Sequence, residues 1–588
     1  MIALMKSRSA FALRVRVIAV GAVLIAVVLI GRLYVLQIVH GDEYRQEAEN
    51  EYVRQSQNQV DRGSIFFTSK DGTEISAATI ASGDTIAMNP QKMTDPAAAY
   101  RMLKQHLPDL DEAAFLAKAA KKDEVYEEVA RQVPTDVGMR ITAASVPGIQ
   151  VLKETWRYYP GGPLAAHQIG FLAYGQDGVT LTGQYGLERY YDTALTRSAN
   201  GLYVNFFADL FTNIRSELFS DAAGPGADLV TSIEPTVQSF LEGELRKYSD
   251  AWHPKIAGGI IMDPSTGAII AMGSLPDFDL NDFRNADPSA FRDPLVANDY
   301  EFGSIMKAIT MASGIDSGAV TEATTYNDTG CITLDQKKIC NYDLKARGVI
   351  PMQQVLSQSL NVGASFVALK MGTTTFADYL KRFGIEEETG IDLPSEVSPL
   401  IANLASHRQV EFATASFGQG IAMNAVAMTR ALATLADHGE VPSPHVGVEL
   451  DYGGGITKKI GWSPPRAAIS PESADTITRM LVAVVDTALA NGKAKLPGYS
   501  VAAKTGTAQI AAPGGGYYPD RYLHSFFGYF PAFDAKFIVF FFALEPQGAQ
   551  YASETWTQPF MDTTKFLINY YDIPPDRAPV ASSTSLKR

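Results

Sequence analysis

The sequence predicts an α+β protein in which an antiparallel sheet, assembled from distant parts of the chain, packs against helices. Two apolar hairpins lead to this prediction. The runs 257–262 and 268–272 are joined by the turn-forming residues 263–267. The runs 525–530 and 536–544 are joined by a similarly short turn. Because the chain between the hairpins has mostly helical patterns, the sheet has to combine both ends of this region and be covered by helices.

The first forty residues predict a membrane anchor. Residues 17–31 carry no charge, and after Arg32 the apolar character resumes as far as Val39. The stretch 17–39 is long enough to cross a hydrocarbon layer of ~30 Å, with Arg32 near one end. A basic cluster precedes it and predicts a cytoplasmic tail over residues 1–16 and an extracytoplasmic body. A cleaved signal peptide is the alternative, but its apolar region is normally shorter and ends at a small-residue cleavage site.

Further domains are expected because a chain of 588 residues is too long for one compact core. Residues 40–225 mix short strand-like and helical runs, with 97–130 as the clearest helical part. They contain no dense group of catalytic residue types, which indicates a spacer or docking module. The pattern changes near residue 226 and predicts a second domain over 226–572. The Ser-rich end, 573–588, predicts a disordered tail.

The composition excludes some classes of function. Hydrophobic residues make up 46% of the chain and charged residues 19%, which is typical of packed interiors and not of disorder. The formal net charge is -14, which disfavours nucleic acid as a partner because phosphate is bound through an excess of Lys and Arg. No cysteine spacing resembles a zinc site, so no metal is expected.

The chain contains two cysteines, Cys331 and Cys340, separated by a short polar stretch. Two strands joined by that stretch could bring the sulfurs together as a disulfide in an oxidising compartment. Two free thiols are the alternative, and the sequence leaves both open.

Three short motifs follow one another in a fixed order and indicate the chemistry. They are Ser304-Ile305-Met306-Lys307, Ser359-Leu360-Asn361 and Lys504-Thr505-Gly506-Thr507. Each motif alone has an ordinary explanation, since Ser304 and Asn361 could cap helices, Lys307 could be solvated, and residues 504–506 could form a plain turn. The ordered set, in helix and strand contexts, favours nucleophilic catalysis.

The spacing of the first motif predicts an activated serine. Lys307 lies one helical turn after Ser304, so its amine can reach the Ser304 hydroxyl. A lysine takes a proton from serine only if its pKa falls, which burial and a second cation bring about. Lys504 is the expected second cation.

The other two motifs predict how the substrate is held. Ser359 and Asn361 are expected on a loop before a helix, with one hydroxyl for proton relay and one amide for a peptide carbonyl. In the strand 501–510, the missing side chain of Gly506 is expected to let the substrate backbone pass, while Thr505 and Thr507 hold a terminal carboxylate. The backbone N–H groups of Ser304 and Thr507 are the expected oxyanion hole, typically worth about 3 to 4 kcal/mol per donor.

With these motifs in place, the chain resembles the class B penicillin-binding proteins from the anchor to about residue 570. Two groups of segments extend the resemblance beyond the catalytic motifs. Those that resemble the family's non-catalytic pedestal, or dimerisation-like, module are residues 61–65, 71–72, 157–160, 166–171 and 185–188. Those that resemble its transpeptidase domain, which is related to serine β-lactamases, are residues 262–264, 417–420 and 525–531.

The resemblance implies a peptidoglycan D,D-transpeptidase. Ser304 would attack the penultimate D-Ala carbonyl of a stem pentapeptide, D-Ala would leave, and the acyl group would pass to an amine of a neighbouring stem. D-Ala-D-Ala carboxypeptidase-like chemistry is possible at the same site, β-lactams would acylate the same serine, and no cofactor is implied.

The resemblance also implies a place in the cell. Such proteins are single-pass proteins of the bacterial plasma (inner) membrane with a periplasmic catalytic domain. They act beside a polytopic membrane glycosyltransferase of the shape, elongation, division and sporulation group. The segment Ser359 to Gly363 looks more like division-type than elongation-type members.

Three positions depart from the family pattern: Phe302 and Ala308 stand where proline is common, and Asn424 where threonine is usual. Two other functions remain as alternatives. A class D-like β-lactamase or penicillin sensor shares the first and third motifs but would not need residues 44–226. A non-catalytic divisome scaffold would keep the fold and the anchor without the reaction.

Overall fold

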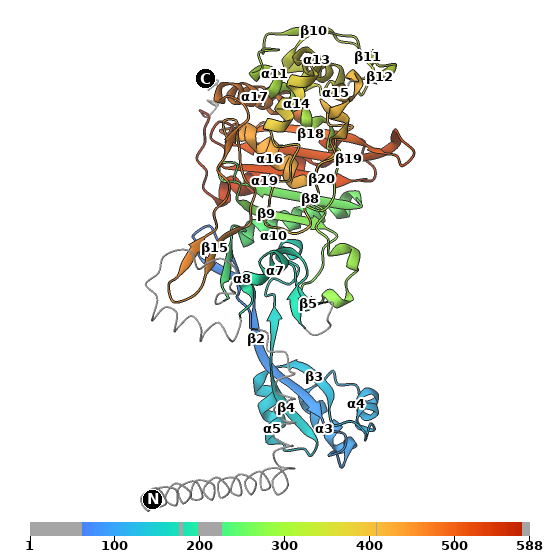
Figure 1. Ribbon diagram of the computed structural model, residues 1–588, viewed down its shortest axis with the longest axis vertical. Helices are drawn as coiled ribbons and strands as arrows, with labels where there is room; N and C mark the ends of the chain where they lie inside the picture. Colours follow the sequence, from blue (N-terminus) through green and yellow to red (C-terminus); the bar gives the residue numbers. More distant parts are fainter. Residues whose placement is uncertain (1–60, 176–179, 198–225, 407, 579–588) are drawn as a thin grey trace, which may run out of the picture. The chain divides into compact units, whose positions relative to one another are not determined.

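The structure is a computed structural model that describes residues 61–175, 180–197, 226–406 and 408–578. Among these residues, Ile80–Trp156 form one compact unit, and Asp61–Thr79 form a second, larger unit with the chain from Arg157 onward (Figure 1). The anchor predicted over 17–39 lies outside the described residues. No helix within the described ranges is long and apolar enough to cross a membrane.

The smaller unit places three helices beside three strands. The end of β2 (Glu74–Met88) pairs with both β3 (Glu127–Val133) and β4 (Ile149–Tyr158). The helices are α3 (Pro96–His106), α4 (Glu112–Ala119) and α5 (Thr135–Ala143). Their core includes Ile86, Met88, Leu103, Phe115 and Ile141.

The helical prediction for residues 97–130 is confirmed over α3 and α4 but is wrong at its end. Residues 127–130 begin β3 and pair with β2 through Ala130 and Ile86. Glu127 and Glu128 favour a helix by local propensity, but pairing with a neighbouring strand and packing of Val129 against the core override that weak preference.

The larger unit begins with a sheet that joins segments far apart in the sequence. Strand β1 (Ile65–Thr68) pairs antiparallel with the start of β2 and parallel with β7 (Asp228–Thr231). Strand β7 then pairs with β15 (Gly447–Asp451), and β15 with β16 (Thr457–Lys459). The sheet therefore combines residues from both sides of position 226, where the sequence placed a domain boundary.

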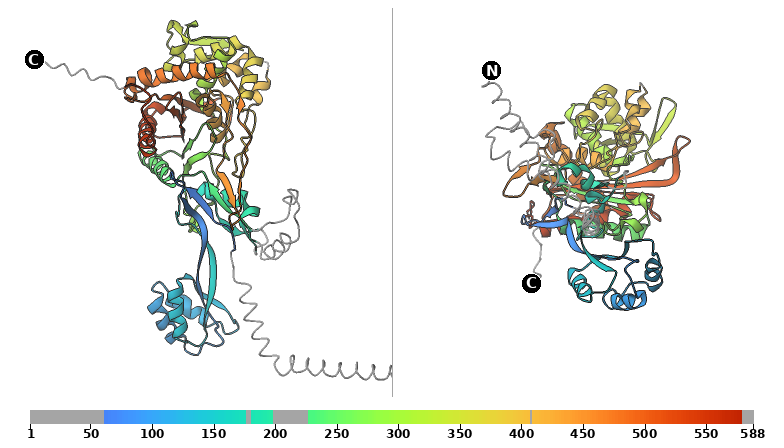
Figure 2. Two further views of the ribbon diagram at one scale, coloured as in Figure 1. Left: turned by 90° about the vertical axis from the view of Figure 1, so that its left-hand side faces the viewer. Right: turned by 60° about the horizontal axis from the view of Figure 1, so that its bottom comes forward.

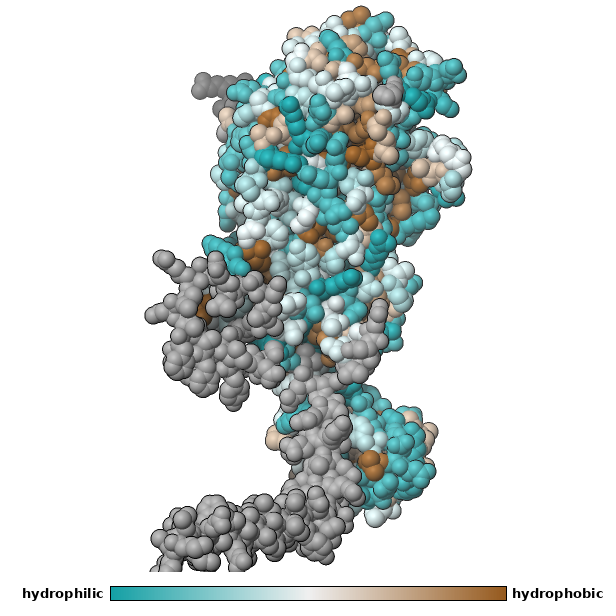
Figure 3. All heavy atoms as spheres, viewed as in Figure 1, coloured by the Kyte–Doolittle hydropathy of each residue, from teal (hydrophilic) through white to brown (hydrophobic). Residues whose placement is uncertain are grey.

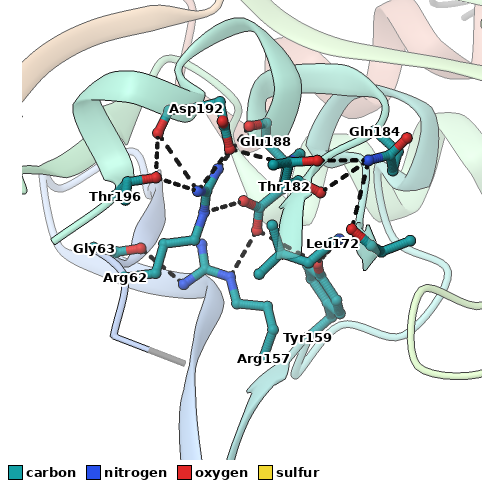
Figure 4. Close-up of polar contacts among 12 residues, drawn as sticks. Arg62, Gly63, Arg157, Tyr159, Leu172, Thr182, Gln184, Glu188, Asp192 and Thr196 are labelled. Carbon is teal, nitrogen blue, oxygen red and sulfur yellow. Dashed lines mark hydrogen bonds and ion pairs between the residues drawn. The ribbon is translucent and has the colours of Figure 1, made fainter. Parts of the chain in front are cut away.

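A buried ion-pair cluster lies beside this sheet (Figure 4). Glu188 is fully buried, and its carboxylate accepts hydrogen bonds from Arg62 at 2.7 Å and from Arg157 at 2.6 Å. Arg62 also pairs with Asp192 at 2.8 Å. Glu188 and Asp192 come from two short helices, α7 (Gly186–Tyr190) and α8 (Asp192–Leu195). The cluster brings together three of the segments that the sequence singled out in the pedestal region.

Three further short elements complete this region: α6 (Ala166–Ile169), β5 (Leu172–Tyr174) and β6 (Leu181–Gly183).

The main sheet has five antiparallel strands in the order β18-β19-β20-β8-β9. Its strands are β8 (Ile256–Met262), β9 (Ile269–Leu275), β18 (Ala502–Ala511), β19 (Tyr517–Phe530) and β20 (Phe537–Leu544). Both predicted hairpins are present, and β20 joins them because Phe540 pairs with Ile260. The antiparallel sheet built from distant segments is therefore confirmed.

Helices cover both faces of this sheet (Figure 2). On one face, α10 (Pro235–Trp252) and α19 (Thr557–Tyr570) pack against the sheet, and Trp556 stacks on Tyr248 with ring centroids 3.6 Å apart. On the other face lies a helical lobe. Its helices are α11 (Met306–Asp316), α12 (Met352–Ser357), α13 (Asn361–Met371), α14 (Thr373–Arg382), α15 (Gln409–Ala415), α16 (Ala425–Ala436) and α17 (Pro471–Ala483). Alternate strand residues supply the two cores, as the two-residue repeat of a strand requires.

Small two-stranded sheets and the end of the chain complete the larger unit. The paired strands are β10 (Thr325–Asp328) with β13 (Gly348–Pro351), β11 (Cys331–Leu334) with β12 (Lys337–Cys340), and β14 (Glu440–Val441) with β17 (Arg466–Ala467). The described chain continues past residue 572, where the sequence placed the end of the domain. Asp576 accepts a hydrogen bond from Ser500 N at 2.7 Å, and Arg577 pairs with Asp486 at 2.9 Å. Hydrophilic and hydrophobic residues are mixed over the visible face of this unit (Figure 3).

Candidate active site

Ser304 lies in a tight helical turn, Gly303–Ile305, that leads into α11. Gly303 has a φ of 67°, in the left-handed region that favours glycine. It donates its N–H to Gly418 O at 3.2 Å, and a Cβ added to it would lie 2.9 Å from the Cβ of Ala508. The turn that carries Ser304 is therefore held between the Gly418 loop and strand β18.

Lys307 reaches back from α11 to Ser304. Its Nζ lies 2.9 Å from Ser304 Oγ, 3.2 Å from Ser359 Oγ and 2.7 Å from Ser359 O. The side chain is only 1% exposed. Burial, and then the charge of Lys504, hold the pKa of Lys307 well below its usual range. Both effects favour the uncharged form of the amine beside the serine, which is the form that can accept a proton.

Lys504 approaches the same point from β18. Its Nζ donates to Ser359 Oγ at 3.0 Å and to Thr505 O at 2.8 Å. It is 2% exposed, and burial lowers its pKa to about 7. The Ser359 hydroxyl thus lies within hydrogen-bonding distance of both amines.

The second motif lies between α12 and α13. Ser359 has a φ of 54°, an unusual backbone conformation for a residue with a side chain. Helix α13 begins at Asn361, whose Nδ2 donates to Cys340 O at 2.9 Å. Cys340 is bonded to Cys331, so the disulfide and not the pair of free thiols is present.

The third motif lies in β18, the edge strand of the sheet. Thr505 and Thr507 are half-buried, and Thr507 Oγ1 accepts a hydrogen bond from Ala552 N at 3.0 Å. Gly506 faces inward, because a Cβ on it would lie 2.6 Å from Phe302 O. Its lack of a side chain therefore lets β18 approach the segment ahead of Ser304.

Hydrogen bonds join four of the five predicted catalytic side chains, Ser304, Lys307, Ser359 and Lys504, while Asn361 follows Ser359 by two residues and contacts Cys340 O. The structure also excludes the ordinary explanations for these residues. The residue at the N-cap of the turn before α11 is Phe302 and that before α13 is Leu360, so neither Ser304 nor Asn361 caps a helix. Lys307 is buried rather than solvated. Lys504, Thr505, Gly506 and Thr507 belong to a strand and not to a turn.

The sequence did not reveal the structural roles of Ser525, Phe302 and Asn424. Ser525 donates its hydroxyl to Phe302 O at 2.7 Å, which fixes the chain just before Ser304. Phe302 is 1% exposed and packs edge-on against Phe540. Asn424 caps α16 by accepting from Ala427 N at 2.8 Å. Two of the departures from the family pattern, Phe302 and Asn424, thus have structural roles, and only the apolar character of position 302 signalled its burial.

Within the described ranges, no group of three or more His, Cys, Asp or Glu side chains is arranged to hold a metal ion.

Comparisons with known proteins place the chain among relatives of the same organisation. The family model of the penicillin binding protein transpeptidase domain matches residues 257–563, and that of the penicillin-binding protein dimerisation domain matches residues 58–231. Stage V sporulation protein D of Bacillus subtilis is 28% identical over 538 residues, covering 90% of this chain and 80% of that protein. Peptidoglycan D,D-transpeptidase FtsI of Escherichia coli is 26% identical over 539 residues, covering 90% of this chain and 87% of that protein.

Solved structures show the same fold. Penicillin Binding Protein 2X from Streptococcus thermophilus has a TM-score of 0.71 at 20% identity, covering 88% of this chain and 80% of that one. Penicillin binding protein 3 from Mycobacterium tuberculosis, complexed with aztreonam, has a TM-score of 0.66 at 21% identity, covering 89% of this chain and 98% of that one.

Proposed function

Because the chain belongs to the class B penicillin-binding proteins, whose transpeptidase and dimerisation domains both match it, we propose that Ser304 is the residue acylated during catalysis. The enzyme is a peptidoglycan D,D-transpeptidase that cross-links cell-wall stem peptides and is a target of β-lactams. The observation that supports Ser304 most directly is the buried Lys307 amine 2.9 Å from its hydroxyl.

Acylation begins with a proton transfer from Ser304 to the uncharged amine of Lys307. Ser304 Oγ attacks the carbonyl carbon of the penultimate D-Ala, and the C–N bond to the terminal D-Ala breaks. The departing amine needs a proton, and Ser359 can relay one because its hydroxyl contacts Lys307 and Lys504. An amine of a second stem then attacks the ester, forms the cross-link and returns Ser304 to its free form.

Substrate binding is assigned to β18 and to Asn361. Thr507 accepts a hydrogen bond from Ala552 N, so its own hydroxyl hydrogen can be donated to a terminal carboxylate, as can that of Thr505. Lys504 adds a positive charge to this end of the site. Asn361 uses one N–H on Cys340 O and has a second N–H for a substrate carbonyl. The backbone N–H groups of Ser304 and Thr507 are the proposed oxyanion hole.

The remaining proposals concern the place of the enzyme in the cell. Residues 17–39 are proposed to anchor it in the plasma membrane, with the catalytic unit in the periplasm, because the apolar stretch follows a basic tail. A polytopic glycosyltransferase of the shape, elongation, division and sporulation group is the proposed partner. Division rather than side-wall growth is the proposed setting, and imaging of a fluorescent fusion through the cell cycle tests it.

Labelling of membranes with a fluorescent penicillin tests the nucleophile. The full-length protein is expected to form a long-lived adduct, and Ser304→Ala to form none. Ser317→Ala, at the far end of α11, is the matched control and should label like the wild type. Labelling of Ser304→Ala at the wild-type rate would refute the assignment.

The same preparation separates the alternatives. Rapid turnover to hydrolysed penicillin would favour a β-lactamase or a sensor derived from one. Absence of any wild-type adduct, with a thioester substrate also left unreacted, would favour a non-catalytic scaffold.

A further inference from the structure

The segment 328–347, here called the bracing segment, packs against the active site without supplying a reacting group. It contains the disulfide-bonded hairpin of β11 and β12, in which Cys331 and Cys340 are directly opposite each other. β11 and β12 are labelled beside α13 and α15 in Figure 1. The transpeptidase chemistry proposed above gives this segment no role.

The bracing segment contacts the Ser359 loop on both of its sides. Before Ser359, Gln358 accepts a hydrogen bond from Arg347 Nε at 3.0 Å. After it, Asn361 donates to Cys340 O at 2.9 Å, and the Val362 N–H donates to Asn341 Oδ1 at 3.1 Å. The loop is therefore tied to one segment by three hydrogen bonds that flank its central residue.

Asn341 is the central connection of these contacts. It is 1% exposed, and its Nδ2 donates to both carboxylate oxygens of Asp328, at 2.9 and 3.1 Å. Asp328 is equally buried and also accepts from Arg347 N at 3.1 Å. Each buried polar group of this set depends on another, so removal of the Asn341 side chain leaves Asp328 and the Val362 N–H without these partners.

The Ser359 loop needs such support because of its own conformation. A residue with a side chain at a φ of 54° is held there only when its surroundings determine it. The Ser359 hydroxyl must also stay within 3.0 Å of Lys504 and 3.2 Å of Lys307. A small shift of the loop would break one of these contacts and interrupt the proton path.

We propose that Asn341 and the disulfide-braced hairpin position Ser359 and Asn361 for acylation of Ser304. The role rests on the proposed function, because it concerns the proton relay of that reaction. Asn341 acts as a positioning residue, since it reaches the reacting atoms only through α13 and the Ser359 loop.

The disulfide contributes by fixing the carbonyl that Asn361 uses. Cys340 supplies that carbonyl, and its sulfur ties β12 to β11. A dithiol reductant breaks the S–S bond by two exchange steps, in which the two cysteine sulfurs gain two electrons and two protons and the dithiol becomes a cyclic disulfide. Reduction therefore removes the covalent bond between β11 and β12 of the bracing segment without changing any reacting group.

Acylation kinetics with a chromogenic β-lactam test Asn341. The first-order acylation constant of Asn341→Ala is expected to fall about tenfold or more, as for a misplaced catalytic group, while the dissociation constant of the non-covalent complex changes less than about threefold. Most of the affinity is expected to remain because Thr505 and Thr507, which hold the carboxylate in the proposed mechanism, lie on β18 outside the segment, and only the contact of Asn361 with a substrate carbonyl is affected. Asn327→Ala, an exposed asparagine in neighbouring β10, is the matched control and should leave both constants unchanged.

Reduction supplies a second test that needs no change in the packing of Asn341. Treatment of the full-length wild type with the dithiol is expected to lower the first-order acylation constant several-fold, and reoxidation to restore it. The double variant Cys331→Ala/Cys340→Ala is expected to start at the lower value and to show no response to the dithiol.

The outcomes separate this role from the function on which it depends. Normal acylation constants in both Asn341→Ala and reduced wild type would overturn the positioning role and leave the function intact. A fall in affinity at constant acylation rate would also overturn it. If Asn341→Ala does not fold, the dithiol experiment decides alone. Failure of oxidised wild type to be acylated at all would overturn both.

Discussion

At the scale of single residues, Lys504 sets the expected pH dependence of the reaction. Burial lowers its pKa to about 7, so it loses its charge as the pH rises past that value. In the proposed mechanism its charge holds the substrate carboxylate and keeps the Lys307 amine deprotonated. The acylation rate of the wild type is therefore expected to fall above about pH 7.

The variant Lys504→Arg tests this assignment by the shape of the profile and not by the absolute rate. A guanidinium stays charged throughout the accessible range, so the alkaline fall should move upward by about two pH units or more. The measurement is the acylation rate constant between pH 5 and 10 for both proteins. An alkaline fall at the same pH in wild type and variant would show that another group titrates.

Lys307 gives a second prediction at this scale, on stability. Its pKa is well below the usual lysine value in the fold and ordinary in the unfolded chain, so the unfolded chain binds one more proton between those two values. The destabilisation that buried Lys307 causes in the wild type therefore becomes smaller as the pH rises toward about 10.5, the pKa of an ordinary lysine. We expect Lys307→Met to lose acylation. We also expect it to be more stable than the wild type at pH 7 and to lose part of that difference as the pH rises. Denaturant titrations at pH 7 and 9.5 measure the two free energies of unfolding. A variant less stable than wild type at pH 7 would contradict the desolvation cost assigned to Lys307.

At the scale of elements, His524 connects the main sheet to α18 (Ala552–Thr555). It lies in β19 opposite Thr507, with Nδ1 3.0 Å from the Thr555 hydroxyl and Nε2 3.2 Å from Gln550 O. Burial lowers its pKa to about 4. Since the unfolded value is near 6.5, the unfolded chain binds the extra proton between these two values, and stability is lost as the pH falls through that window.

Across the full pKa shift of His524, the free energy of unfolding is expected to fall by about 3 kcal/mol, at 1.36 kcal/mol per pKa unit. His524→Gln should be less sensitive to acid over this window by that amount, and His438→Gln, at an exposed histidine, should behave like the wild type. Denaturant titrations at pH 4 and 7 measure the difference. Equal acid sensitivity of wild type and His524→Gln would contradict the role of this buried contact.

The elements also show what the sequence could predict. The hairpins around residues 263–267 and 531–535 were predictable because apolar runs, turn residues and strand length all agree locally. The catalytic motifs were predictable because their spacing is itself a helix or strand geometry. The pairing of β7 with β1 and with β15 was not, since it depends on contacts across more than a hundred residues that leave no local pattern. The contact of Asn361 with Cys340, 21 residues away, and that of the inward-facing Gly506 with the distant Phe302 likewise leave no local pattern.

At the scale of the whole molecule, the larger unit is interrupted in sequence by the smaller one. The chain leaves it at Thr79 and returns at Arg157. Arg62 and Arg157 lie on the two sides of this interruption, and both pair with Glu188. The buried carboxylate thus ties the outgoing and returning segments to each other within the larger unit. Loss of the Glu188 carboxylate would leave two buried guanidinium charges without a partner, which is strongly destabilising.

Replacement of Glu188 tests that connection through the stability of the full-length protein. Glu188→Gln keeps the shape but leaves Arg62 and Arg157 without their shared carboxylate, and is expected to lower the free energy of unfolding by about 3–5 kcal/mol. Glu387→Gln removes the acid of the exposed pair with Arg466 and should cost less than about 1 kcal/mol. Denaturant titration measures both, and penicillin labelling at low temperature should remain in each because Glu188 and Glu387 are outside the catalytic set. A Glu188→Gln protein as stable as the Glu387→Gln control would show that the two segments are held by the surrounding apolar packing and not by the ion pairs.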